Sequence, residues 1–145
     1  MTLEKRLPLA LFLLRISVFL VMLMWTLDKF FRPAHGAAVF EKFYLIGGLG
    51  NAPIYLIGAI QMLIILAFVA GFQKKISYLL VLFMHAVSTL SAFKVYFAPY
   101  ADGPNLLFFA AWPMLAACFA LYTLRDFDTQ WAIEQPKTVE NRELI

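Results

Sequence analysis

This chain of 145 residues has few charged residues, two histidines and a single cysteine. Charged residues make up 14% of it, against about 25% in soluble domains, which excludes an ordinary soluble domain, a disordered chain and a nucleic-acid-binding protein. The lone Cys118 excludes an intrachain disulfide and the four-helix thiol oxidases, whose electron transfer needs cysteine pairs. His35 and His85 cannot supply two bis-histidine haem sites.

Motifs for enzymatic chemistry are also missing from the sequence. It contains no phosphate-binding loop, nucleotide-binding fingerprint or hydrolase motif. His85 has too few neighbouring ligand types for a metal site. No secretory signal peptide is expected, because the first apolar stretch is too long for one and lacks a cleavage site. We therefore expect no metal site, no evident cofactor and no catalysis by the chain alone.

Long hydrophobic runs dominate what is present, since 63% of the residues are hydrophobic. Each run has about 20 residues, or roughly 30 Å as a helix, which matches the hydrocarbon thickness of a bilayer. Helices are favoured over strands because lipid requires satisfied backbone groups and no short alternating pattern is seen. The sequence predicts an all-α membrane protein, an antiparallel four-transmembrane-helix bundle, with spans at about 7–27, 52–72, 76–97 and 105–124.

The lysines and arginines predict the orientation of this domain, which we place at 1–128. Seven lie on one side and four on the other, so the positive-inside rule puts both termini in the cytoplasm. The longer outer loop, 28–51, has apolar residues among its charges and is expected to be partly interfacial. Residues 129–145 are predicted to form a polar cytoplasmic tail. The seven are Lys5, Arg6, Lys74, Lys75, Arg125, Lys137 and Arg142, and the four are Lys29, Arg32, Lys42 and Lys94.

Three spans place a strongly polar residue at a similar depth. Arg15, His85 and Gln61 lie roughly 12, 14 and 17 Å from the inner ends of their spans. Polar groups inside a membrane are costly, which makes these three candidates for a buried polar centre that binds an anionic or quinone-like head group. Two alternatives stay open: the three residues join the helices by hydrogen bonds, or Arg15 extends to the cytoplasmic surface.

A second group of polar residues lies near the outer ends of the spans. It includes Asp28 and Lys29, and Asp28 could neutralise Lys29 or Lys94. These residues are candidates for an outer vestibule, and ordinary interfacial anchoring of helix ends is the alternative. The members are Asp28, Lys29, Ser88, Ser91, Lys94 and Asn105.

The layout resembles the DoxX-like family of small four-helix inner-membrane proteins, over roughly 7–128. The matching features are Leu14-Arg15 followed by Asp28-Lys29-Phe30, then Gly58, Gly71 with Lys74-Lys75, and Leu124-Arg125-Asp126. Gln61 stands where the family has an acidic residue. The resemblance implies a multi-pass protein of the bacterial inner membrane. Some family members are linked to redox complexes, including small subunits of thiosulfate:quinone oxidoreductases.

Three functions are compatible with these features. The first is a non-catalytic subunit or anchor of a redox or sulfur-related membrane complex that contacts quinone. The second is a small oligomeric transporter or permeation module, although no Asp or Glu lies inside a span. The third is a factor for membrane-complex assembly or lipid binding. The expected partners are membrane lipid, membrane or periplasmic redox subunits and further copies of the chain, but not nucleic acid.

Overall fold

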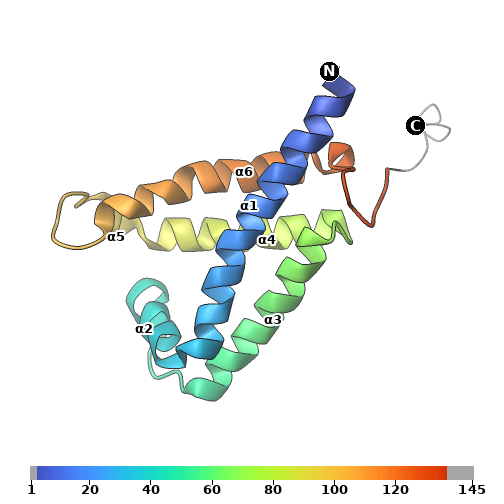
Figure 1. The fold of residues 1–145 in the computed structure, drawn as a ribbon. Helices are drawn as coiled ribbons and strands as arrows, with labels where there is room; N and C mark the ends of the chain where they lie inside the picture. The colour runs from blue at the N-terminus through green and yellow to red at the C-terminus, as the bar shows by residue number, and fades with distance from the viewer. Residues whose placement is uncertain (1–2, 137–145) are drawn as a thin grey trace.

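A computed structural model describes residues 3–136, and these form helices and turns without any strand. The all-α prediction is therefore confirmed. Lys137 and Arg142, which were counted for the orientation, lie outside the described residues. The helices, shown in Figure 1, are α1 (Leu3–Phe31), α2 (Pro33–Tyr44), α3 (Asn51–Val69), α4 (Lys74–Ser91), α5 (Phe93–Tyr96) and α6 (Ala111–Thr123), with the 3₁₀ helices η1 (Asn105–Ala110) and η2 (Arg125–Phe127).

Three helical stretches within the described residues are long and apolar enough to cross a membrane. They are Lys5–Phe31, Asn51–Val69 and Asn105–Thr123. They coincide with the first, second and fourth predicted spans, and they indicate a multi-pass membrane protein.

The third predicted span, 76–97, is interrupted in the structure. α4 ends at Ser91, and the separate α5 begins after Ala92. α4 also includes Lys74 and Lys75 in its first turn, which lowers its overall hydrophobicity. The prediction of a fourth span therefore depends on which residues of α4 face the core and which face outward.

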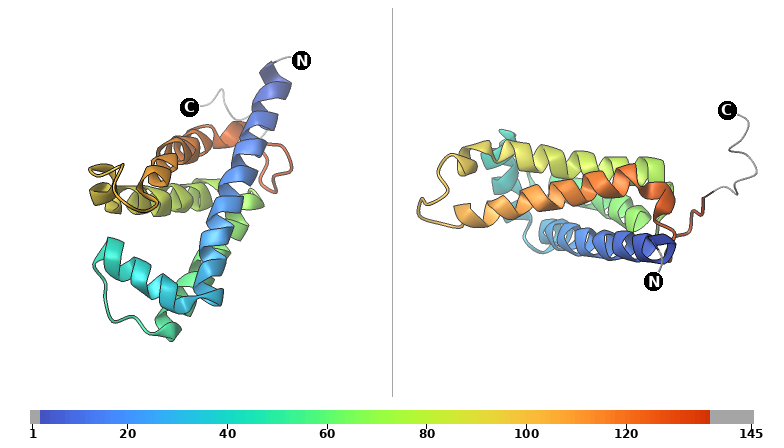
Figure 2. Two further views of the ribbon diagram at one scale, coloured as in Figure 1. Left: turned by 60° about the vertical axis from the view of Figure 1, so that its left-hand side comes forward. Right: turned by 90° about the horizontal axis from the view of Figure 1, so that it is seen from above.

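The long helices form two antiparallel pairs. α1 packs on α3, and α4 packs on α6. Figure 1 shows the first pair crossing the second at a steep angle, and Figure 2 shows the same arrangement from two other sides. α2 lies in the angle between the pairs, where Phe43 contacts Phe108 of η1 with ring centroids 5.7 Å apart.

A tight turn joins the two pairs between α3 and α4. Gly71 has φ +62° and Gln73 has φ 48°, so the chain reverses through two left-handed residues. Glycine adopts that conformation without steric cost. The Ser77 hydroxyl then donates to the carbonyl oxygens of Phe72 and Gln73, at 2.8 and 3.2 Å, which stabilises the first turn of α4.

Every long helix contributes two side chains to one buried hydrophobic core. Helix association in a membrane depends on such close packing, because lipid tails provide little hydrophobic driving force between helices. α4 therefore contributes as many buried side chains to this core as α1, α3 and α6 each do. Its members are Leu11 and Val18 of α1, Ile65 and Phe68 of α3, Tyr78 and Val81 of α4, and Cys118 and Leu121 of α6.

Most buried residues of α4 are polar, and most of its exposed residues are apolar. The buried positions recur at spacings of three and four, which defines one helix face. A helix of a soluble protein shows the opposite arrangement. The outer face of α4 therefore suits lipid. The buried positions are Lys74, Ser77, Tyr78, Val81, His85 and Thr89, and the exposed hydrophobic ones are Ile76, Leu79, Leu80, Phe83, Val87 and Leu90.

Candidate functional site

Arg15 is fully buried in the structure. It lies on the inward stripe of α1 between Leu11 and Val18, which are four residues before it and three after it. Its side chain has no exposed surface, and it is the largest of the fully buried side chains. A guanidinium group keeps its charge in proteins, so this position requires acceptors close by.

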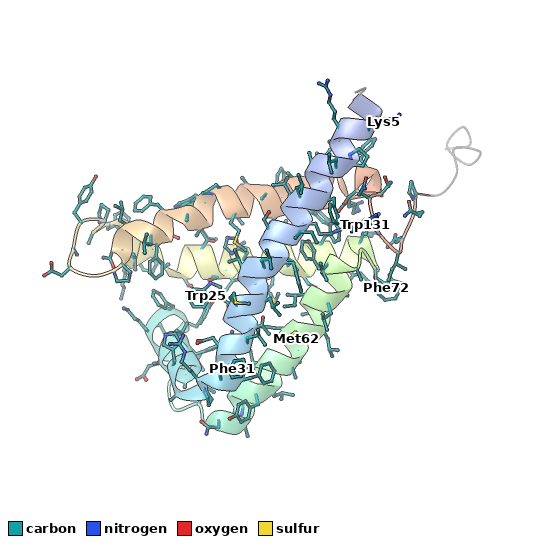
Figure 3. The ribbon with its side chains drawn as sticks, in the orientation of Figure 1. Lys5, Trp25, Phe31, Met62, Phe72 and Trp131 are labelled. Atoms are coloured by element: carbon teal, nitrogen blue, oxygen red, sulfur yellow. The ribbon has the colours of Figure 1, made fainter. Side chains whose placement is uncertain are left out.

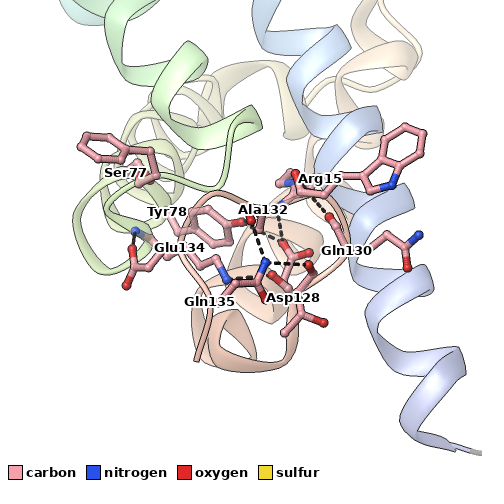
Figure 4. Close-up of polar contacts among 12 residues, drawn as sticks. Arg15, Ser77, Tyr78, Asp128, Gln130, Ala132, Glu134 and Gln135 are labelled. Carbon is pink, nitrogen blue, oxygen red and sulfur yellow. Dashed lines mark hydrogen bonds and ion pairs between the residues drawn. The ribbon is translucent and has the colours of Figure 1, made fainter. Parts of the chain in front are cut away.

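Four acceptors surround the Arg15 guanidinium (Figure 4). One terminal nitrogen donates to the Tyr78 hydroxyl at 3.1 Å and to Oδ2 of Asp128 at 3.2 Å. The other donates to the carbonyl oxygens of Gln130 and Trp131, at 2.5 and 3.3 Å. The Tyr78 hydroxyl in turn donates to Oδ2 of Asp128 at 2.7 Å. Arg15 thus links α1, α4 and the chain that follows α6.

Residues 128–135, here called the return segment, fold back across the turn between α3 and α4. The amide of Ile133 donates to the carbonyl of Ala70 at 2.9 Å, and the amide of Glu134 donates to that of Gly71 at 3.0 Å. Oε2 of Glu134 accepts a hydrogen bond from the Lys74 amide at 2.7 Å. This places a carboxylate at the N-terminus of α4, where the helix dipole favours negative charge.

Gly71 allows the return segment to approach this closely. A Cβ atom at Gly71 would lie 2.6 Å from the Cβ of Ala132 and 2.9 Å from Nη1 of Arg15. Real Cβ contacts are not that short. Gly71 therefore has a packing role in addition to its left-handed conformation.

The Arg15 cluster, defined as Arg15, Lys74, Tyr78 and Asp128, is balanced in charge by the neighbouring Glu134. Lys74 donates through Nζ to the carbonyl of Asp128 at 2.8 Å. Nε of Arg15 and Oδ1 of Asp128 are buried without a hydrogen-bond partner among the described residues. A buried ion pair of this kind is costly to break, because the remaining charge loses its partner. These contacts hold the return segment against α1 and α4.

The structure does not bring Arg15, Gln61 and His85 together. Nε2 of His85 lies 3.0 Å from the Ala111 carbonyl, which ties α4 to the start of α6. Gln61 is half-buried, and its side chain forms no hydrogen bond among the described residues. Residue counts estimate depth, but they give neither the rotation of each helix nor the direction of a long side chain. The Arg15 side chain extends to the return segment, and so the predicted polar centre is not formed.

The proposed outer vestibule also separates into local contacts. Ser91 donates to the Ser88 carbonyl at 2.9 Å, within its own helix turn. Asn105 donates to the Ala98 carbonyl at 2.8 Å, and the Lys94 side chain is exposed. The structure thus assigns these four residues to helix ends and turns.

Asp28 pairs with neither of the lysines considered in the sequence. Its carboxylate accepts a hydrogen bond from Nε of Arg32 at 2.6 Å and lies 2.5 Å from Nδ1 of His35. Lys29 instead donates to the Trp25 carbonyl at 3.1 Å. Asp28 thus joins the end of α1 to the start of α2.

Sequence reasoning overlooked Asp128 as the partner of Arg15. One signal was available, because a buried arginine needs a carboxylate and no span contains one. Asp128, which follows the fourth span, was therefore a candidate. The other signal was helical spacing, which puts Lys74, Tyr78 and His85 on one face of α4.

Comparison with protein-family models, curated proteins and solved structures finds no match for this chain. The interpretation of the site therefore depends on its own geometry. That geometry consists of a buried, charge-balanced cluster at one end of the long helices and a partly exposed group around Asp28 at the other.

Proposed function

We propose that the chain is a four-span integral protein of the bacterial inner membrane, with both termini in the cytoplasm. The packing of α4 supports the fourth span, because most of its exposed residues are apolar and most of its polar residues are buried. Lys74 and Lys75 then lie at a membrane surface.

We further propose that the protein acts as a non-catalytic subunit or anchor of a membrane complex. The observation that carries this proposal is that the chain's own acceptors hold both terminal nitrogens of the buried cation, Arg15. A catalytic or ligand-binding arginine needs a face free for its substrate. This guanidinium instead fixes the return segment to the bundle, which gives the membrane domain a rigid end on which a partner can assemble.

The class of partner follows from the resemblance to the DoxX-like family. That resemblance favours a redox or sulfur-related complex, and a quinone contact would then be made together with a partner subunit. A transporter is less well supported, because Arg15 and His85 both have hydrogen-bond partners within the fold.

Purification in a mild detergent tests this proposal. We expect the tagged chain to elute with another membrane or periplasmic protein at a fixed molar ratio, and mass spectrometry of the peak would identify that protein and any quinone. The isolated chain reconstituted in liposomes should show neither turnover nor solute flux. Flux or turnover by the isolated chain that Arg15→Met abolishes would contradict the proposal.

A further inference from the structure

A pocket of about 200 Å³ lies at the corner between α1 and α2. Its lining combines apolar and charged side chains. Figure 3 labels Trp25 beside α1, on the side of α1 where α2 lies in this view. The lining residues are Met24, Trp25, Asp28, Arg32 and His35.

One carboxylate holds both basic side chains of the pocket. Oδ1 of Asp28 binds Nε and Nη2 of Arg32, and Oδ2 binds Nδ1 of His35. The Asp28 side chain is 11% exposed, whereas those of Arg32 and His35 are 67% and 44% exposed. Nη1 of Arg32 and Nε2 of His35 have no hydrogen-bond partner among the described residues. The carboxylate thus orients both side chains and leaves Nη1 of Arg32 as a donor for a ligand.

The free donor of Arg32 and the depth of this corner favour an anion attached to an apolar chain. Among the lining residues Arg32 balances Asp28 in charge, and Arg32 is the more exposed of the two. Met24 and Trp25 are 58% and 54% exposed, and they provide an apolar wall one turn before Asp28. The pocket lies near the end of the Lys5–Phe31 stretch, where lipid head groups meet a span.

We infer that this pocket binds a phosphate group, with Arg32 as its hydrogen-bond donor and with Met24 and Trp25 against an attached apolar chain. Arginine matches phosphate oxygens in geometry as well as in charge. The volume suits a head group rather than a whole ligand, since complete small-molecule sites are about 300–1,000 Å³. The phosphate can come from a membrane phospholipid or from a soluble phosphate.

Native mass spectrometry of the full chain in neutral detergent tests the inference. We expect phosphatidylglycerol to be retained in preference to diacylglycerol with the same acyl chains, because only the former has a phosphate. Arg32→Gln should weaken retention about tenfold, as for the loss of one charged hydrogen bond. Lys94→Gln removes an exposed cation near the same end of the molecule and should leave retention unchanged.

A second variant keeps the test decisive if Arg32→Gln does not fold. Met24→Trp fills the pocket and retains every charge, so it should also lower retention. If inorganic phosphate displaces the lipid, the pocket recognises the phosphate alone. If inorganic phosphate does not displace the lipid, binding also requires the acyl chain. Both results support the site. Equal retention of phosphatidylglycerol and diacylglycerol would overturn the inference, as would unchanged retention in the folded Arg32 and Met24 variants.

Discussion

Replacing Asp128 with asparagine should destabilise the protein more than any other single carboxylate-to-amide change among the described residues. The substitution keeps the shape of the side chain and removes its charge, which leaves the Arg15 guanidinium without an ionic partner. Both side chains have no exposed surface, so water cannot replace the lost carboxylate without opening the return segment.

The magnitude follows from the contacts that remain. Removing one partner of a buried ion pair costs about 3–5 kcal/mol. The asparagine oxygen can still accept a hydrogen bond from Tyr78, and Arg15 keeps its bonds to the carbonyls of Gln130 and Trp131. We therefore expect a loss of about 3 kcal/mol, at the lower end of that range.

Unfolding by sodium dodecyl sulfate in detergent micelles, followed by circular dichroism, would measure this loss. Asp126→Asn is the matched control, because Asp126 lies two residues earlier and is exposed. The double variant Arg15→Met/Asp128→Asn should be more stable than Asp128→Asn alone, since it removes the unpaired charge. Equal free energies of unfolding for Asp128→Asn and Asp126→Asn would refute a stabilising ion pair between Arg15 and Asp128.

Two further substitutions probe the packing around the Arg15 cluster. An alanine in the left-handed conformation costs about 1–2 kcal/mol by itself. Gly71→Ala should lower the unfolding free energy by more than that, because the added Cβ would also collide with Ala132. Gly48→Ala is the control, since its φ is +75° with no atom within 4 Å of the added Cβ, and equal losses in the two variants would contradict the packing role. Tyr78→Phe should cost about 1–2 kcal/mol in the same assay, because Asp128 loses one donor, and an unchanged unfolding free energy would show that this hydroxyl does not contribute.

The sequence predicted the helices far better than it predicted the contacts between them. Apolar runs of about 20 residues identify helices in lipid by length and composition alone. The spans at 7–27, 52–72 and 105–124 accordingly match long helices of the structure. The end of α4 was predicted six residues too late, because Ala92 to Phe97 is apolar enough to continue a helix and no glycine or proline marks the break.

The polar contacts were harder to predict, because they depend on helix rotation and on a segment far away in the sequence. Arg15 and Asp128 are 113 residues apart, and the polar tail gave no sign that residues 128–135 return to the bundle. The depth estimate paired Arg15 with His85, whereas the structure directs the Arg15 side chain to the end of the bundle. The prediction did not use helical spacing across the start of α4, which places Lys74 and Tyr78 on one buried face.

Thiol labelling from outside intact bacterial cells tests the central claim, that α4 is the fourth span, most directly. In a Cys118→Ala background, single cysteines would replace Lys75 and Asp102, which are exposed and lie on either side of α4. A membrane-impermeant maleimide should label the Asp102→Cys variant directly and the Lys75→Cys variant only after permeabilisation. Direct labelling of both variants, or of neither, would show that α4 does not cross the membrane and would contradict the account.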